Sequence, residues 1–443
     1  MRALLLTTVI LGMLPLVLLQ PHVGVLLFYW ISLMNPHRLA WGFASDFQYA
    51  FIVALVTIAA WLFSKERKAI PLTSPTILLG LLWLWMSWTT LNALSPAQAY
   101  LKWELVSKIL LMTFVTIPIM QSRTRLHALI WVIVGSLGYY GVKGGGFSIQ
   151  TAGVYQVVGP PTTFIGDNNA MALALDMVLP LIWYLRLASR SILIRQGLLL
   201  AIGLTALAVV TTYSRGGLIG LAIVVAAALA RSRHRLVLGL GVVAMVVAMQ
   251  SFLPGQWFDR MKSISTYEAD ASSQIRLSMW KMAVEIARDR PFLGGGFKVF
   301  IDPAVYPRYN PDMPDFHDVH SIYFEMLGEH GVVGFALFLA LGMATLWQLT
   351  WIRRQTRKRE ELKWAYDMAS MIFVSLVGYA VAGAFLTLAT FDLYYLLVGV
   401  TVALRQTVQA CLKDQPAARS SDDLSMPATW SNAEAPISTQ EGR

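Results

Sequence analysis

The sequence is poor in charge and in cysteine. Only 14% of its 443 residues are charged, 56% are hydrophobic, and Cys411 is the one cysteine. A single thiol excludes an internal disulfide and any metal site built from several cysteines. So few charges leave no stretch with the composition of a separate soluble catalytic domain. The mean hydropathy of +0.57 indicates a membrane protein instead.

Nucleotide and metal motifs are also missing. The chain has no Walker loop, and its glycine triplets at 144–146 and 294–296 lack the strand–turn–helix context of a dinucleotide fingerprint. A His-Glu-x-x-His zinc motif is absent too, so we expect neither a metal nor another cofactor. Any activated substrate would therefore have to reach this protein by a route other than a soluble nucleotide site.

Long apolar runs are what the sequence has in abundance. A helix of about 20 apolar residues crosses roughly 30 Å of hydrocarbon. Eleven candidate spans follow residue 45, at 50–63, 76–91, 105–120, 126–142, 170–187, 197–212, 218–230, 236–252, 332–349, 368–386 and 393–404. Before them, 3–19 reads as an uncleaved signal-anchor, and Pro21 separates it from a shallow or broken second segment. The sequence predicts an all-α polytopic membrane protein with about twelve spans.

Basic residues orient these spans. They gather in every second linker, at 65–68, 123–125, 186–195, 231–235 and 353–363. The positive-inside rule makes these linkers cytoplasmic, so both chain ends are expected there. The segments on the other side are 92–104, 143–169, 213–217, 254–331 and 387–392. The net charge of +10 mostly reflects the inner linkers, so no nucleic-acid partner is expected.

This alternation divides the chain into four parts. Residues 1–253 hold helices with short loops, 254–331 form one large outer loop with short helices, and 332–410 hold the C-terminal helices. The tail, 411–443, is rich in Ser, Ala, Pro and acidic residues and predicts a disordered cytoplasmic extension.

The end of the large outer loop carries candidate site residues. His317 and His320 are three apart and would share a face if the segment is helical, and histidine suits proton transfer near neutral pH. Glu325 and Glu329 follow at helical spacing. Either carboxylate could orient a histidine or contact a sugar, or simply be solvated at a helix entrance. An isolated histidine is also more often structural than catalytic.

Two arginines on the outer side of the predicted membrane each allow two interpretations, as a site residue or as a structural residue. Arg215, in Thr-Tyr-Ser-Arg-Gly-Gly, is either a guanidinium held at the outer interface or a snorkelling residue that ends a helix. Arg276 lies in 274–287, where apolar residues recur at helical spacing and Trp280 shares the arginine's side. That stretch is either part of a site or a surface helix lying on the bilayer.

Polar residues also precede the span at 170–187. Asp167 and Asn168 belong to Phe-Ile-Gly-Asp-Asn-Asn-Ala, three acid or amide side chains before an apolar run. The plain interpretation is a helix cap, a role that suits Asp167.

The order of several motifs resembles the O-antigen ligase and polymerase superfamily. They are Ser-Arg-Gly-Gly-Leu at 214–218, Arg276 with Trp280, Arg-Pro-Phe-Leu-Gly-Gly-Gly at 290–296, and His-Ser-Ile-Tyr-Phe-Glu-Met-Leu-Gly-Glu-His-Gly at 320–331. The resemblance covers about 160–410. More narrowly, Met34-Asn-Pro-His-Arg, Trp41-Gly-Phe-Ala and the 164–170 segment resemble the exosortase A-associated putative O-glycosylation ligases of bacteria that make exopolysaccharide.

The resemblance implies a GT-C-like membrane glycosyltransferase in the bacterial inner membrane. Its donor would be a glycan on a polyprenyl diphosphate of the undecaprenyl type, its acceptor a hydroxyl of a protein or lipid, and its site would face the periplasm. Arg215 and Arg276 would stabilise the departing diphosphate without a metal. His320 would take the acceptor proton, predicting inversion at the anomeric carbon. Family members often have His-Asn where this chain has His320-Ser321, but the downstream Glu-x-x-Gly favours His320 over His317.

The resemblance leaves supporting and alternative roles open. His317, Glu325, Glu329, Asp167 and Asn168 are candidate substrate-binding residues. A repeat-unit polymerase would use the same bond chemistry as a ligase, and chain-length analysis of surface glycan separates the two. A transporter or flippase usually carries ionisable groups at mid-membrane depth, and there the predicted spans offer only Asp176.

Overall fold

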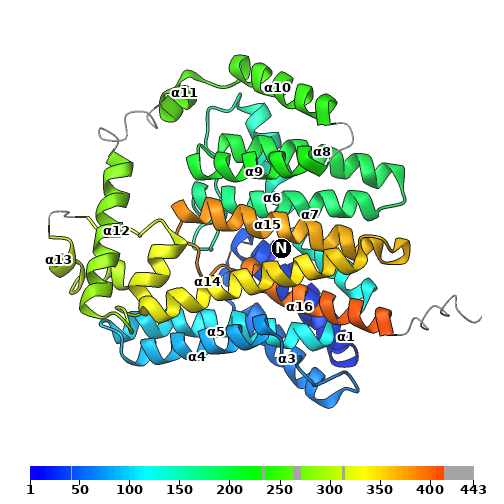
Figure 1. Ribbon diagram of the computed structural model, residues 1–443, viewed down its shortest axis with the longest axis horizontal. Coiled ribbons are helices and arrows are strands. Elements are labelled where there is room, and N and C mark those ends of the chain that lie inside the picture. The colour runs from blue at the N-terminus through cyan, green and yellow to red at the C-terminus, as the bar shows by residue number, and fades with distance from the viewer. Residues whose placement is uncertain (41, 232–234, 263–270, 312–314, 414–443) are drawn as a thin grey trace, which may run out of the picture.

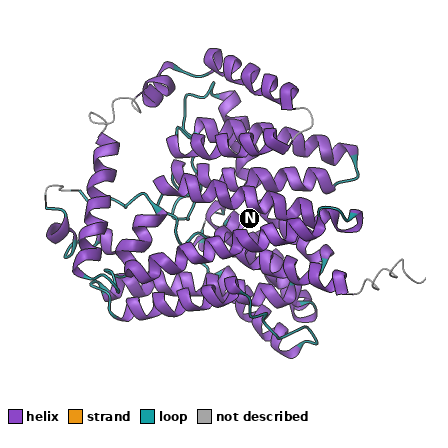
Figure 2. Ribbon diagram, in the orientation of Figure 1, coloured by secondary structure: helices purple, strands orange, loops and turns teal. Residues whose placement is uncertain are grey.

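The computed structural model describes residues 1–40, 42–231, 235–262, 271–311 and 315–413. All regular structure in these ranges is helical, without strands (Figures 1 and 2). Trp41 of the Trp-Gly-Phe-Ala motif and the predicted tail beyond Lys413 lie outside the described residues. The all-α fold class is therefore confirmed for the part of the chain described.

Each predicted span corresponds to a helix. The bundle consists of α1 (Arg2–Leu19), α2 (Pro21–Met34), α3 (Tyr49–Phe63), α4 (Ser74–Leu91), α5 (Pro96–Ile119), α6 (Arg123–Gln150), α7 (Asn168–Ala188), α8 (Ile192–Thr211), α9 (Arg215–Arg231), α10 (Arg235–Phe252), α14 (Ile322–Thr356), α15 (Lys363–Ala382) and α16 (Asp392–Lys413). Seven helices in the described ranges are long and apolar enough to cross a membrane, or eight if a bent pair after Gly239 is one span. A polytopic membrane protein is thus supported, and the count of about twelve crossings stays a prediction.

The helices differ in what surrounds them. α7 lies among α6, α8, α9 and α15, and 83% of its most apolar stretch is buried. In α1 and in α8 only 22% of the corresponding apolar stretch is buried. Large apolar side chains of these two helices, such as Leu5 and Leu200, are exposed. A helix that is apolar all round is stable either inside protein or in lipid. We infer that α7 belongs to the protein core and that α1 and α8 face the membrane.

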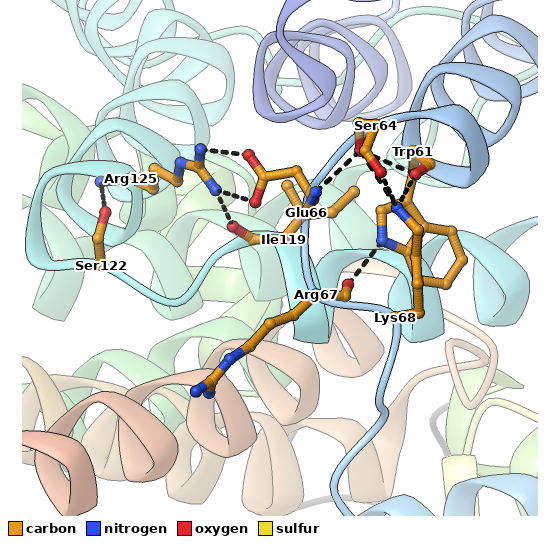
Figure 3. Close-up of polar contacts among 8 residues, drawn as sticks. All are labelled: Trp61, Ser64, Glu66, Arg67, Lys68, Ile119, Ser122 and Arg125. Atoms are coloured by element: carbon orange, nitrogen blue, oxygen red, sulfur yellow. Dashed lines mark hydrogen bonds and ion pairs between the residues drawn. The ribbon is translucent and has the colours of Figure 1, made fainter.

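The basic linkers, predicted to be cytoplasmic, and the segments predicted to face the other side lie at opposite ends of the bundle. The α7–α8 and α14–α15 linkers lie at the right of Figure 1, with the end of α16, whereas α12 and α13 lie at the left. Figure 3 shows the α3–α4 linker joined to the start of α6. There Arg125 holds Glu66 by two hydrogen bonds of 2.6 and 2.9 Å, which lower the pKa of Glu66. The right-hand end is therefore the one rich in basic linkers.

The large loop forms a small subdomain with its own core. Its core is formed by α12 (Ala271–Asp289), a 3-10 turn η3 (Val299–Ile301) and α13 (Tyr306–Tyr309). The loop also contains α11 (Gly255–Lys262), whose Trp257 indole instead donates to the Val210 carbonyl near the end of α8 (Ile192–Thr211). Met279, Met282 and Ile286 of α12 are completely buried, which confirms the amphipathic helix predicted at 274–287. α12 packs against α14, so it is not merely a helix lying on a bilayer.

α14 begins ten residues before the predicted span and breaks at Gly331. That glycine has φ 67° and ψ −171°, a backbone region open essentially to glycine alone. The loop at 291–296 packs into the break, where the Val332 amide donates to the Pro291 carbonyl and the Gly296 amide to that of Glu329. The break lets the first nine residues of α14, about two and a half turns of helix, carry Glu325 and Glu329 toward the subdomain before the membrane span begins.

Gly331→Ala is expected to destabilise the protein. A Cβ at residue 331 would lie 2.2 Å from the Phe292 carbonyl oxygen, and the backbone region alone costs about 1–3 kcal/mol. Thermal unfolding in detergent measures the loss. The control is Gly203→Ala in α8, where no atom lies within 4 Å of the added Cβ. Equal melting temperatures for the two variants would contradict the strained break.

Candidate active site

His320 lies in an irregular segment, not on a helix. Residues 316–321 have no regular structure, so the expectation that His317 and His320 share a helix face is wrong. His320 itself has a positive φ of 49°. Its amide donates a 2.7 Å hydrogen bond to Thr387 Oγ1 in the α15–α16 turn. Strained backbone held by a specific contact is common where a side chain must point in one direction.

α12 fixes the segment from the other side. The Trp280 indole donates to the Val319 carbonyl at 3.0 Å and stacks on Phe324, with ring centroids 5.0 Å apart. Arg276 lies one helical turn before Trp280 on α12. The structure therefore brings the arginine's helix against the segment that carries His320, as the shared side of Arg276 and Trp280 suggested.

The surroundings keep His320 neutral. Burial lowers the pKa of its imidazole, the positive charge of Arg276 lowers it further, and Asp318 and Asp167 partly oppose this. A neutral imidazole has a free lone pair at pH 7 and can accept a proton. The charges of Arg276, Asp167 and His317 all act on His320, so these four predicted site residues are gathered together.

Arg215 is the first residue of α9, beside the same turn that holds His320. Ser214 Oγ accepts from the Gly217 amide at 3.1 Å and caps the helix. A Cβ on Gly216 would lie 3.5 Å from Phe385 Cβ, in the turn leading to Thr387. The start of α9 therefore lies against the turn that leads to Thr387.

Asp167 and Asn168 have identifiable structural roles. Asp167 Oδ1 accepts from the amides of residues 169 and 170 at 2.9 and 3.0 Å, which confirms the helix-cap interpretation. Asn168 Nδ2 donates to the Thr212 carbonyl at 2.8 Å, tying the start of α7 to the residues before Arg215. These contacts position the site, and direct substrate binding by either residue stays a prediction.

Glu325 and Glu329 are buried, so their interpretation as solvated helix-entrance residues is wrong. They are 3% and 4% exposed. Glu325 Oε2 accepts from the Ala389 amide and Glu329 Oε1 from the Lys298 amide, each at 2.8 Å. Both carboxylates therefore hold other segments to α14 and reach the interior of the site.

A polar cavity of about 170 Å³ lies beside the His320 segment. Its lining residues are Lys102, Thr163, Phe164, Asp167, Lys298, Phe300, Ile301, Asp318, Glu325, Glu329, Thr387 and Leu388. Sequence reasoning missed Lys102, Lys298, Asp318 and Thr387. Lys102 could have been identified as a candidate from the sequence, because it is a lysine close to the start of an apolar span. The other three come together only through the fold.

The site offers acid–base and anion-stabilising groups. In the described ranges no three His, Cys, Asp or Glu side chains are grouped as metal ligands. The arrangement combines a neutral imidazole, the guanidinium group of Arg276 and a cavity able to exchange several hydrogen bonds. Transfer of a group to a hydroxyl, with an anionic leaving group, is chemistry that such a set can perform.

Two family models match the chain. Residues 198–339 match the model described as O-Antigen ligase, and residues 1–190 match one described as a family of unknown function (DUF5935). No curated protein matches the chain. The first match supports the superfamily that the motifs resemble, whereas the exosortase-associated subtype stays an expectation. Arg215, Arg276 and His320 fall in the first matched segment, and Lys102 and Asp167 fall in the second.

Proposed function

We propose that this protein is a membrane glycosyltransferase of the O-antigen ligase type. It transfers a glycan from a polyprenyl-diphosphate carrier to a hydroxyl acceptor at the periplasmic face of the bacterial inner membrane. The observation that carries the proposal is His320, held by Thr387, close to Arg276 and next to the polar cavity. The ligase-family match over 198–339 supports it.

Side chains of this protein can accept the proton and stabilise the negative charge that the reaction produces. The acceptor oxygen attacks the anomeric carbon as its proton passes to the imidazole of His320, and the bond from that carbon to the diphosphate oxygen breaks. The bonding electrons leave with the diphosphate, whose growing charge Arg276 and Arg215 stabilise. Attack from the face opposite the leaving group inverts the anomeric configuration. The prenyl chain stays in the lipid.

Reconstitution tests the proposal. The purified chain in lipid vesicles receives a polyprenyl-diphosphate oligosaccharide and hydroxyl acceptors, and released prenyl diphosphate is compared with new glycoside. Equal amounts of both, unchanged by a chelator, are expected. Movement of the lipid-linked glycan between leaflets without glycoside formation would instead establish transport.

A repeat-unit polymerase is the alternative function, because the superfamily that the motifs resemble includes both reactions and the match over 198–339 does not separate them. Chain length distinguishes them in cells. Loss of a polymerase leaves single repeat units, whereas loss of a ligase leaves long polymers on the lipid carrier.

A further inference from the structure

A groove with a volume of about 870 Å³ lies beside the basic α3–α4 linker. It is formed where α1 ends, α2 begins and α3 ends. Leu18 and Leu19 of α1 and Phe63 of α3 line it, and these side chains are 57%, 79% and 92% exposed. Contiguous exposed apolar surface marks a site of contact with lipid or with another protein. Because α1 faces the membrane, the acyl chains of lipids can reach this groove directly.

Polar side chains line the groove where α3 ends. They belong to Ser64, Lys65 and Glu66. Figure 3 shows Arg125 bound to both carboxylate oxygens of Glu66, at 2.6 and 2.9 Å, so the negative charge of this glutamate is compensated. The charge that remains at this end is that of lysine. The groove therefore has an apolar body and a positively charged end.

Two lysines at the charged end differ in how their donors are used. Lys68 Nζ donates to the carbonyl oxygens of Trp61 and Ser64 and to Ser64 Oγ (Figure 3). An ammonium group has three hydrogens, so Lys68 supplies charge but no spare donor. Lys65 is exposed and makes no hydrogen bond or ion pair with any residue that the structure describes. Its ammonium group is therefore available to an anion at the end of the groove.

We propose that this groove binds an anionic phospholipid. Its acyl chains lie along Leu18, Leu19 and Phe63, and its phosphate contacts Lys65. The apolar walls would accept any lipid, but the lysines favour a negatively charged headgroup. The volume falls in the range of about 300–1,000 Å³ that is typical of ligand sites.

This lipid is a different molecule from the glycan donor. The proposed donor reacts at His320, whose segment is held by α12 at the left of Figure 1, whereas the basic linkers lie at the right. The phospholipid would instead add apolar contacts to α1, a helix with little protein around it. Because a ligand that binds only the folded state stabilises it, the phospholipid should raise the melting temperature. None of this depends on the transfer reaction.

Native mass spectrometry of the full chain in detergent tests the proposal, because it counts bound lipids and gives their dissociation constants. The delipidated protein is titrated with phosphatidylglycerol, phosphatidylcholine and glycerol phosphate. Phosphatidylglycerol is expected to bind about fivefold more tightly than phosphatidylcholine, and Lys65→Ala should remove this preference, the usual contribution of one basic residue near anionic headgroups. Lys358→Ala is the control, since it removes an exposed lysine from the basic α14–α15 linker, outside the groove.

Ala59→Trp tests the apolar body of the groove. Ala59 lines the groove and is partly exposed, so an indole there fills the space without entering the protein core. Both phospholipids should bind at least about tenfold more weakly, because several CH₂ groups lose their contact with the protein. The rise in melting temperature that phosphatidylglycerol causes in the wild type should disappear.

Several results would overturn the proposal. Equal affinity for the two phospholipids, equal effects of Lys65→Ala and Lys358→Ala, or unchanged binding by Ala59→Trp would show that lipid contacts the protein without a specific site. Glycerol phosphate that binds as tightly as phosphatidylglycerol would show a phosphate site that needs no groove. A dimer in the same spectra that Ala59→Trp dissociates would show that a second copy of the chain occupies the groove.

Discussion

Replacing His320 with alanine is expected to lower the rate of glycan transfer about 100- to 10,000-fold, the usual contribution of a general base. The Thr387 contact is made by the backbone amide of residue 320, so it survives the substitution and the segment should keep its course. The measurement is single-turnover release of prenyl diphosphate by the purified variant, with its melting temperature as a check on folding.

The pH dependence gives a second signature of the same base. The pKa of His320 is lowered below the usual 6.5 by burial and by Arg276, so the neutral, proton-accepting form predominates at pH 7. As pH falls through that lowered pKa the imidazole becomes protonated and kcat/KM should fall. The midpoint of the acidic limb in the pH profile of kcat/KM is therefore expected below pH 6.5. A limb centred above pH 7 would argue against His320 as the base.

His317→Ala is the matched control. The two histidines belong to the same irregular segment, but only His320 has its backbone held by Thr387. Loss of His317 removes one nearby positive charge when protonated, and we expect transfer to change only a few-fold. If His317→Ala abolished transfer and His320→Ala did not, the assignment of the base would move to His317.

The helices were predictable because hydrophobic periodicity and length are local properties of the sequence. The amphipathic stretch at 274–287 became α12, and the cap at Asp167 formed where the polar run met an apolar helix. In both cases residues within a turn or two determine the outcome. The side shared by Arg276 and Trp280 was predictable for the same reason.

The cavity was not predictable, because it depends on contacts between distant segments. Lys102, Lys298 and Glu329 are far apart in the chain and meet only after the Gly331 break turns the start of α14 toward the subdomain. The break itself rests on the loop at 291–296, whose backbone groups bind those of 328–332. Likewise, the positive φ of His320 reflects Thr387, a residue 67 positions away. Helical spacing therefore gave the wrong geometry for the two histidines.

Arg276→Ala is expected to lower transfer about 100- to 1,000-fold, the range seen when a donor that stabilises developing negative charge is removed. Arg276→Lys should recover part of this loss, because lysine keeps the charge but not the forked donors that match a diphosphate. Arg288→Ala is the control, since that exposed arginine on the same helix contacts Glu285 at the surface. Its transfer rate should stay close to that of the wild type.

The pH profile of Arg276→Ala distinguishes a role in the reaction from a role in folding. The charge of Arg276 lowers the pKa of His320, so its removal should raise that pKa and move the acidic limb of kcat/KM to higher pH. Arg276→Lys, which keeps a positive charge, should leave the limb nearer its original position. A variant that only unfolds would lose amplitude without moving the limb, and full transfer by Arg276→Ala would remove this arginine from the mechanism. A slow enzyme with a displaced limb is the result expected if one guanidinium both stabilises the leaving diphosphate and keeps the neighbouring imidazole neutral.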